Sequence, residues 1–206
     1  MNKRLLQLIV ALCVLALPMQ SLAMRVLCLG DSQTTVWSGY KSSYCDILDE
    51  MRDDIETVNA GVPSDTTAGA FERLKIILEN EHFDIVVIFI GTNDWTLWQY
   101  NDRQPIYTAR AIRKMARYAL HYDAKHVVVM TLLPSLQDAR HEFDRLVSEK
   151  LLKYRWPLYH KKSIVDLFHF FNGRWDSENT YDGVHITIYA AEQIADLLAD
   201  TIPTEE

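Results

Sequence analysis

The chain has 206 residues, of which 49% are apolar, so it is long enough for one domain with a substantial hydrophobic core. Its 28 acidic residues outnumber its 21 lysines and arginines, and the formal net charge is −7. No long basic stripe interrupts this acidic balance, which argues against nucleic acid as a partner.

The first 23 residues form a pattern typical of a secretory signal peptide. Lys3 and Arg4 give a positive start, the stretch from Leu5 to Leu17 is apolar, and small residues precede the predicted cleavage point at Ala23. A membrane anchor is the alternative, but the apolar run is shorter than the roughly 20 residues that a spanning helix needs. We therefore predict a signal peptide over residues 1–23, a mature domain over residues 24–206 without a stable membrane span, and a secreted or periplasmic location.

Five short apolar runs predict strands. They are rich in β-branched residues and lack polar alternation, as expected for parallel strands that are covered on both faces. The predicted strands are Arg25–Gly30, Ile55–Gly61, Ile85–Ile90, Val127–Leu132 and Ile164–Leu167.

Four stretches with apolar residues at helical spacing lie between or after these strands, at residues 67–80, 107–122, 138–154 and 187–202. Strands that alternate with helices predict an α/β protein. We expect a three-layer α/β/α sandwich, flavodoxin-like, around a mostly parallel five-stranded sheet. In such folds ligands bind at the carboxyl ends of the strands.

Residues suited to catalysis follow four of the predicted strands. Ser32 follows the first strand, Gly61 ends the second, and Asn93 follows the third. Asp182 and His185 come after the fifth strand, beyond a loop of polar and aromatic residues. Because the carboxyl ends of parallel strands share one edge of a sheet, we expect these five residues to lie close together.

These residues lie in four motifs, which are GDSQ, NAGVPSDTT, GTND and DGVH in chain order. Together the motifs resemble the four blocks of the SGNH hydrolases, also called the GDSL esterase/lipase family, and the match extends over nearly the whole mature chain. The resemblance implies the SGNH hydrolase fold and a serine hydrolase. Gln33 departs from it where the family name implies leucine, and Pro63-Ser64 departs from it where many members have a small residue and glycine.

The predicted catalytic residues are Ser32, Asp182 and His185. A serine hydroxyl is a poor nucleophile at neutral pH and needs a base within hydrogen-bond reach. His185 is the candidate base, and Asp182 would hold its imidazole in the required tautomer and stabilise the imidazolium. The alternatives are a helix-capping serine, an ordinary Asp-Gly turn and a surface histidine, and the joint pattern of four motifs favours catalysis over them.

The resemblance also implies an oxyanion hole that consists of the backbone N–H groups of Ser32 and Gly61 and the side-chain amide of Asn93. An asparagine amide donates without a titratable charge, and a glycine lets the backbone approach the substrate closely. A turn at the end of a strand also explains Gly61, and a capping role also explains Asn93.

Tryptophans near the motifs are candidates for a substrate pocket, namely Trp37, Trp95 and Trp98. They could form an apolar wall for an acyl chain or a platform for a sugar ring, and ordinary packing is the alternative. The remaining histidines show no metal-ligand spacing and the chain has no phosphate-binding loop, so we predict no metal and no organic cofactor.

Cys28 and Cys45 remain after the predicted cleavage. An exported protein can form a disulfide between them. However, Cys28 lies inside a predicted strand, and this position favours a small core residue over a bridged one.

These observations predict an exported serine esterase of the lipase or acylesterase type, which hydrolyses carboxylic esters through an acyl-enzyme. A carbohydrate O-acetylesterase is the alternative enzyme. A lipid- or sugar-binding protein on the same fold is the alternative without catalysis. We expect a monomer whose partner is a small-molecule, glycan or lipid ester.

Overall fold

A single parallel sheet organises the protein. The computed structural model describes residues 23–36, 42–101, 104–153 and 161–204. Five parallel strands follow the order β2-β1-β3-β4-β5, which confirms the predicted sheet, and each predicted strand is present with its ends shifted by at most two residues. The strands are β1 (Met24–Gly30), β2 (Ile55–Gly61), β3 (Ile85–Phe89), β4 (His126–Met130) and β5 (Lys162–Val165).

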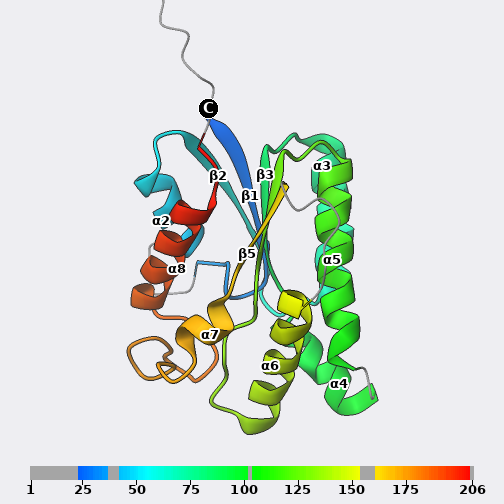
Figure 1. Ribbon diagram of the computed structural model, residues 1–206, viewed down its shortest axis with the longest axis vertical. Coiled ribbons are helices and arrows are strands. Elements are labelled where there is room, and N and C mark those ends of the chain that lie inside the picture. Colours follow the sequence, from blue (N-terminus) through cyan, green and yellow to red (C-terminus); the bar gives the residue numbers. More distant parts are fainter. Residues whose placement is uncertain (1–22, 37–41, 102–103, 154–160, 205–206) are drawn as a thin grey trace, which may run out of the picture.

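Helices cover both faces of this sheet and complete the predicted three-layer sandwich (Figure 1). One face carries α2 (Tyr44–Met51), α7 (Leu167–Phe171) and α8 (Ile188–Thr201), and the other carries α3 (Thr67–Asn80), α4 (Trp95–Asn101), α5 (Pro105–His121) and α6 (Asp138–Lys153). A 3-10 turn, η1 (Thr92–Asp94), leads from β3 into α4. Among the described residues, no helix has the length and apolar character needed to cross a bilayer.

The two faces of the sheet form two separate cores. Val26 and Cys28 of β1 belong to the core under α2 and α8, whereas Leu27 and Leu29 belong to the core under α3 and α5. All four side chains are fully buried. Successive strand residues point to opposite faces, so a strand covered on both sides needs apolar residues at every position. This requirement explains the unbroken apolar run in the sequence.

The sequence did not predict α2, α4 or α7, which are short. A capping box starts α2, in which Ser43 Oγ accepts a hydrogen bond from the Asp46 N–H and Asp46 Oδ2 accepts one from the Ser43 N–H. Asp166 caps α7 by accepting the His169 N–H. That cap starts a helix directly after Val165, so the predicted extension of the fifth strand to Leu167 was wrong.

A disulfide joins Cys28 on β1 to Cys45 in the first turn of α2. Their Cα atoms are 6.3 Å apart, and both side chains are fully buried. The expectation of an unpaired core cysteine was therefore wrong, because Cys28 is both a core residue and bridged. Only the packing of α2 against the sheet brings Cys45 over β1, and the sequence did not predict that helix.

We expect the disulfide to stabilise the folded protein. The bridged residues are 17 positions apart, and a loop of this order contributes about 3 kcal/mol to the free energy of unfolding by restricting the unfolded chain. A Cys28→Ala/Cys45→Ala double variant should therefore show a lower urea midpoint than the oxidised wild type. A reductant should lower the midpoint of the wild type only, and an equal midpoint for both proteins under oxidising conditions would contradict the expectation.

Candidate active site

The candidate site lies where the strand order reverses. The chain passes from β1 to β2 on one side and then to β3 on the other side of β1, so Gly30 at the end of β1 pairs with both Gly61 and Phe89. Ligands of doubly wound folds bind at such a reversal, at the carboxyl ends of the strands. Ser32 follows β1 and Asn93 follows β3, so both residues flank this point.

Ser32, His185 and Asp182 form one chain of hydrogen bonds. His185 Nε2 lies 3.1 Å from Ser32 Oγ, and His185 Nδ1 lies 2.6 Å from Asp182 Oδ2. Ser32 is buried, and the imidazole keeps 23% of its side-chain surface exposed. The three predicted catalytic residues are thus adjacent, although 153 positions separate the serine from the histidine.

The chemistry of Asp182 determines the direction of these hydrogen bonds. Burial raises the pKa of this carboxyl, but hydrogen bonds from the backbone N–H and the imidazole of His185 and from the Val184 N–H outweigh burial and hold the pKa below its usual value. An ionised carboxylate only accepts, so Nδ1 carries the imidazole proton. With a neutral ring, Nε2 accepts the Ser32 hydroxyl proton, which is the arrangement that a general base requires.

A tight turn holds the histidine. Asp182 Oδ1 accepts the backbone N–H groups of Val184 at 2.9 Å and His185 at 2.7 Å. Gly183, between Asp182 and Val184 in the chain, has φ +84°, a conformation that favours glycine. The Tyr181 ring stacks on the imidazole with centroids 5.8 Å apart. The Asp-Gly turn therefore holds Asp182 and His185 together, so the turn is compatible with their predicted catalytic role.

Gly61 lies close to the turn that carries Ser32, residues 31–35, which we call the serine turn. However, the Gly61 N–H already has a hydrogen-bond partner. That N–H donates to Asn59 Oδ1 at 2.9 Å, while Asn59 Nδ2 donates to the Thr34 carbonyl and to Ser43 Oγ, each at 2.8 Å. A Cβ atom at Gly61 would lie 2.6 Å from the Thr35 nitrogen, so the close approach of the serine turn requires glycine here. An oxyanion would have to displace Asn59 Oδ1 to use this donor, so the oxyanion role of Gly61 stays a prediction.

The loop after Gly61 has an unusual backbone conformation at Ser64. Its φ is +65°, in the left-handed region that few residues other than glycine adopt. The resemblance to the SGNH hydrolases implies a glycine at this point of the motif. The loop therefore keeps the backbone conformation that a glycine would adopt, although a serine occupies the position.

Asn93 and Asp94 divide the work of the third motif. Asn93 Nδ2 donates to the Asp65 carbonyl at 3.0 Å, which holds the side chain beside the loop after β2. Asp94 is buried and accepts hydrogen bonds from the Thr67 N–H, the Thr67 hydroxyl and the Thr108 hydroxyl. It thereby ties η1 to the start of α3 and to α5, which fixes the position of the neighbouring asparagine.

Arg73 of α3 closes the ends of two strands, and sequence reasoning did not identify it. Its guanidinium donates to the Gly30 carbonyl at 3.0 Å and to the Ala60 carbonyl at 2.7 Å, and it pairs with Asp65. The Gly30 carbonyl also accepts the Val62 N–H at 3.1 Å, so the guanidinium supplies a second donor to this oxygen. No sequence motif marks the residue, because its partners lie 13 and 43 positions away.

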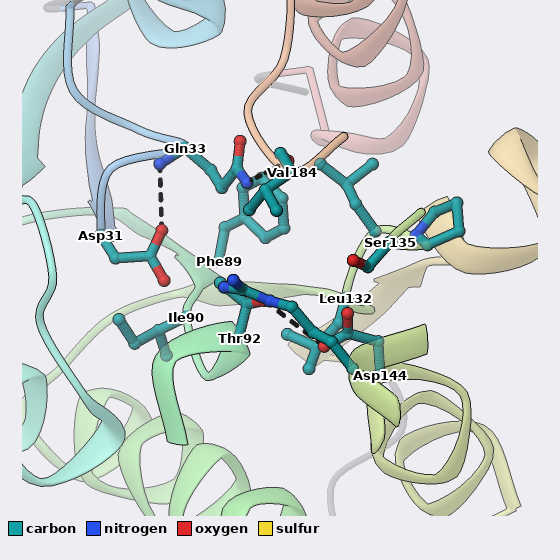
Figure 2. A pocket seen from close by; sticks show the side chains of 12 residues that line it. Asp31, Gln33, Phe89, Ile90, Thr92, Leu132, Ser135, Asp144 and Val184 are labelled. Atoms are coloured by element: carbon teal, nitrogen blue, oxygen red, sulfur yellow. Dashed lines mark hydrogen bonds between the residues drawn. The ribbon is translucent and has the colours of Figure 1, made fainter. Parts of the chain in front are cut away.

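A pocket with several polar groups lies beside the serine turn (Figure 2). Asp31 and Asp144 are buried in its wall, and Arg140 donates to Thr92 Oγ1 at 3.1 and 3.2 Å. Burial raises the pKa of both carboxyls, that of Asp31 to about 7, although the nearby Arg140 lowers each. The pocket is lined by Asp31, Gln33, Phe89, Ile90, Thr92, Leu132, Leu133, Pro134, Ser135, Arg140, Asp144 and Val184.

Trp95 and Trp98, two of the candidate pocket tryptophans, do not line this pocket. Trp95 and Trp98 are partly buried against the core under α3 and α5, and Trp98 lies 5.6 Å from the Phe143 ring of α6 between centroids. Packing therefore accounts for their positions, and their role in substrate binding stays a prediction. Trp37 lies outside the described residues.

The described residues contain no group of three or more histidine, cysteine or acidic side chains that could hold a metal ion.

Sequence reasoning also did not identify Asp31 as a residue of interest, although it lies in the GDSQ motif. Burial raises the pKa of this carboxyl, and the sequence does not show that the residue is buried.

The raised pKa of Asp31 predicts a pH-dependent effect of Asp31→Asn on stability. Between about pH 4 and about pH 7 the unfolded chain has lost this proton and the folded protein keeps it, so stability falls as pH rises. The amide has no such proton but still offers an oxygen to the Gln33 N–H. Urea titrations across this range should therefore show the variant gaining stability relative to the wild type as pH rises, and a constant difference would contradict the assignment.

Comparisons with known proteins bear on the family of the chain. A model of the GDSL-like lipase/acylhydrolase family matches residues 28–188. None of the curated protein sequences matches the chain.

Solved structures share the fold at low sequence identity. A lipase/acylhydrolase from Enterococcus faecalis has 21% identity and a TM-score of 0.67, with 87% of this chain and 95% of that chain covered. A member of the lipolytic protein G-D-S-L family from Veillonella parvula has 20% identity and a TM-score of 0.67, with 86% and 95% covered. A mutant acetyl-xylooligosaccharide esterase from Geobacillus Stearmophilus has 18% identity and a TM-score of 0.69, with 91% and 98% covered.

The fold agrees with the predicted SGNH hydrolase fold, and the family match covers most of the chain. The protein belongs to the GDSL-like lipase/acylhydrolase family.

Proposed function

We propose that this protein is an exported serine esterase that hydrolyses carboxylic esters through an acyl-enzyme. The observation that carries the proposal is the continuous chain of hydrogen bonds from Ser32 Oγ through the imidazole of His185 to the carboxylate of Asp182. A neutral imidazole that accepts the serine proton is the arrangement that activates this nucleophile.

The first half of the reaction transfers the acyl group to the enzyme. Ser32 Oγ attacks the ester carbonyl carbon while its proton passes to His185 Nε2. The bond between the carbonyl carbon and the alcohol oxygen then breaks, and the alcohol leaves with the proton from His185. Asp182 stays ionised throughout and stabilises the imidazolium, which is consistent with its lowered pKa.

The second half returns the enzyme to its starting state. A water molecule gives a proton to His185 and attacks the acyl carbon, and Ser32 leaves with that proton as the carboxylic acid is released. Both halves pass through an oxyanion, for which we propose the Ser32 N–H and the Asn93 amide as donors. The amide has two N–H groups, so its bond to the Asp65 carbonyl leaves one for the substrate.

Two features support export. The first 23 residues have the composition of a signal peptide, and the mature domain contains a buried disulfide between Cys28 and Cys45. Disulfides form and persist in oxidising compartments such as the periplasm and the extracellular space. A secreted or periplasmic location is consistent with both features.

A carbohydrate O-acetylesterase is the second candidate, and the pocket beside the serine turn favours a short acyl group. A long chain directed into this pocket would meet the buried carboxyls of Asp31 and Asp144 and the guanidinium of Arg140. An apolar chain that buries polar groups without replacing their partners is unfavourable. Two solved structures with the same fold are named as acetyl xylan or acetyl-xylooligosaccharide esterases.

Ser32→Ala tests the nucleophile. We expect kcat/KM for p-nitrophenyl acetate to fall by about 10³-fold or more, because the variant lacks the hydroxyl that lies within hydrogen-bond distance of His185 Nε2. A dialkyl fluorophosphate should transfer its phosphoryl group to Ser32 of the wild type with loss of fluoride, which adds the mass of that group, and should not modify the variant. Ser163→Ala, on β5 and bonded to His126, is the matched control and should keep full activity. A variant that keeps more than about a tenth of the activity would remove Ser32 from this role.

A panel of substrates tests the acyl preference. We expect p-nitrophenyl acetate and butyrate to be cleaved about tenfold or more faster than the octanoate and palmitate esters, since polar groups line the pocket. Release of acetate from acetylated xylan would identify the O-acetylesterase. A preference for the longest chains would contradict the short-acyl assignment, and binding without any hydrolysis would favour the non-catalytic alternative.

A further inference from the structure

We infer that Gln33 is a positioning residue that holds two segments together. One is the turn that carries Ser32, and the other is the loop over residues 179–187 that carries His185, called the base loop below. The inference rests on the proposed function, because it concerns the same serine and histidine. It explains the residue that departs from the leucine implied by the family name.

Both ends of the Gln33 amide bind the backbone of the base loop. Nε2 donates to the Val184 carbonyl at 2.8 Å, and Oε1 accepts the Ile186 N–H at 3.2 Å. Figure 2 shows the side chain directed at Val184. These two groups lie on either side of His185 in the chain, so the amide fixes the backbone from which the imidazole extends.

The two bonds of the Gln33 amide act as a clamp on the base loop, and the backbone of Gln33 is itself held in place. The Gln33 N–H donates to Asp31 Oδ1 at 3.0 Å, and the side chain is only 4% exposed. Ser32 is the preceding residue, so the serine and the amide that holds the base loop share one backbone turn. Ser32, Gln33 and the base loop thereby form a closed ring of bonds, which is completed by the contact between Ser32 Oγ and His185 Nε2.

The other hydrogen bonds around His185 bind different parts of the loop. The Val184 and His185 N–H groups are bound to Asp182, and the His185 carbonyl accepts the Thr180 hydroxyl and the Tyr181 N–H, all within the same loop. The Leu136 N–H and the Trp175 indole hold the loop from outside, both at the Gly183 carbonyl. The Gln33 amide instead binds residues 184 and 186, on either side of His185, and does so from the residue next to Ser32.

Glutamine suits this task because one side chain supplies a donor and an acceptor at the same time. A leucine of similar size supplies neither and would leave a carbonyl and an N–H without these partners. The Gln33 amide binds the protein backbone and not the ester bond of the substrate, so Gln33 acts through the position of His185. A displacement of the base of about 1 Å can cost about 100-fold in rate, and we therefore expect the loss in kcat and not in KM.

Gln33→Met tests the coupling, because methionine keeps the length of the side chain and removes both hydrogen bonds. We expect kcat to fall about 10- to 100-fold with KM changed by less than about threefold. Gln193→Met is the matched control. Gln193 Nε2 binds Asn179 Oδ1 at the other end of the same loop, so this variant should lose stability and keep its kcat.

Proton NMR supplies a readout that does not depend on turnover. The His185 Nδ1 proton in its hydrogen bond to Asp182 should resonate far downfield of the amide region in the wild type and in Gln193→Met. In Gln33→Met we expect this signal to shift or broaden. If Ser32→Ala keeps its activity, the proposed esterase mechanism fails, while the NMR signal still decides whether Gln33 holds His185.

Three results would overturn the inference. One is a Gln33→Met variant with kcat within about twofold of the wild type and an unchanged proton signal. Another is an equal loss of kcat in both glutamine variants, which would indicate a structural role only. If Gln33→Met does not fold, amide exchange in the wild type decides, because the Ile186 N–H should exchange slowly and rapid exchange would exclude the clamp.

Discussion

The pairing of β1 with β2 on one side and with β3 on the other is the constraint on which the site depends. The strand is buried on both faces, with Val26 and Cys28 in one core and Leu27 and Leu29 in the other. A slip of one residue would exchange these faces, so the register is strongly specified. This register ends β1 at Gly30 beside Gly61, and Ser32 follows two residues later at the point where the strand order reverses.

Hydrogen bonds from side chains at the strand ends are a second constraint on the site. Arg73 binds the carbonyls that end β1 and β2, and Asp94 gathers three donors from α3 and α5. Arg73 is also paired with Asp65, and the three hydrogen bonds to Asp94 offset the cost of burying its carboxyl. The polar groups therefore hold the rim of the site rigid around the less regular loops.

The base loop, which carries Asp182 and His185, has little regular secondary structure. Residues 179–187 contain no helix or strand beyond a single bridge between Thr180 and Ile186, and the Asp182 turn shapes them locally. Contacts to Gly183 from the Trp175 indole and the Leu136 N–H add support from outside the loop. Functional residues commonly lie on loops that a rigid scaffold positions. Here the Gln33 amide links the turn after β1 to the base loop.

Local patterns in the sequence determined a large part of this architecture. Unbroken β-branched runs predict strands covered on both faces, and the apolar spacing over residues 67–80 predicts α3 to the residue. The motifs that follow the strands identify Ser32, Asn93, Asp182 and His185, since a parallel sheet brings strand ends to one edge. Each of these inferences uses residues within one or two turns of the chain, or a general rule of the fold.

Tertiary packing decided the rest. The Cys28–Cys45 disulfide depends on a short helix that no strong periodicity marks, and the hydrogen bond from Asn59 to the Thr34 carbonyl depends on the path of the serine turn. Gln33 looked like an odd letter in a motif until its partners 151 and 153 positions away were in place. Such contacts join segments whose distance is set by how helices and loops dock on the sheet, and local periodicity carries no information about that docking.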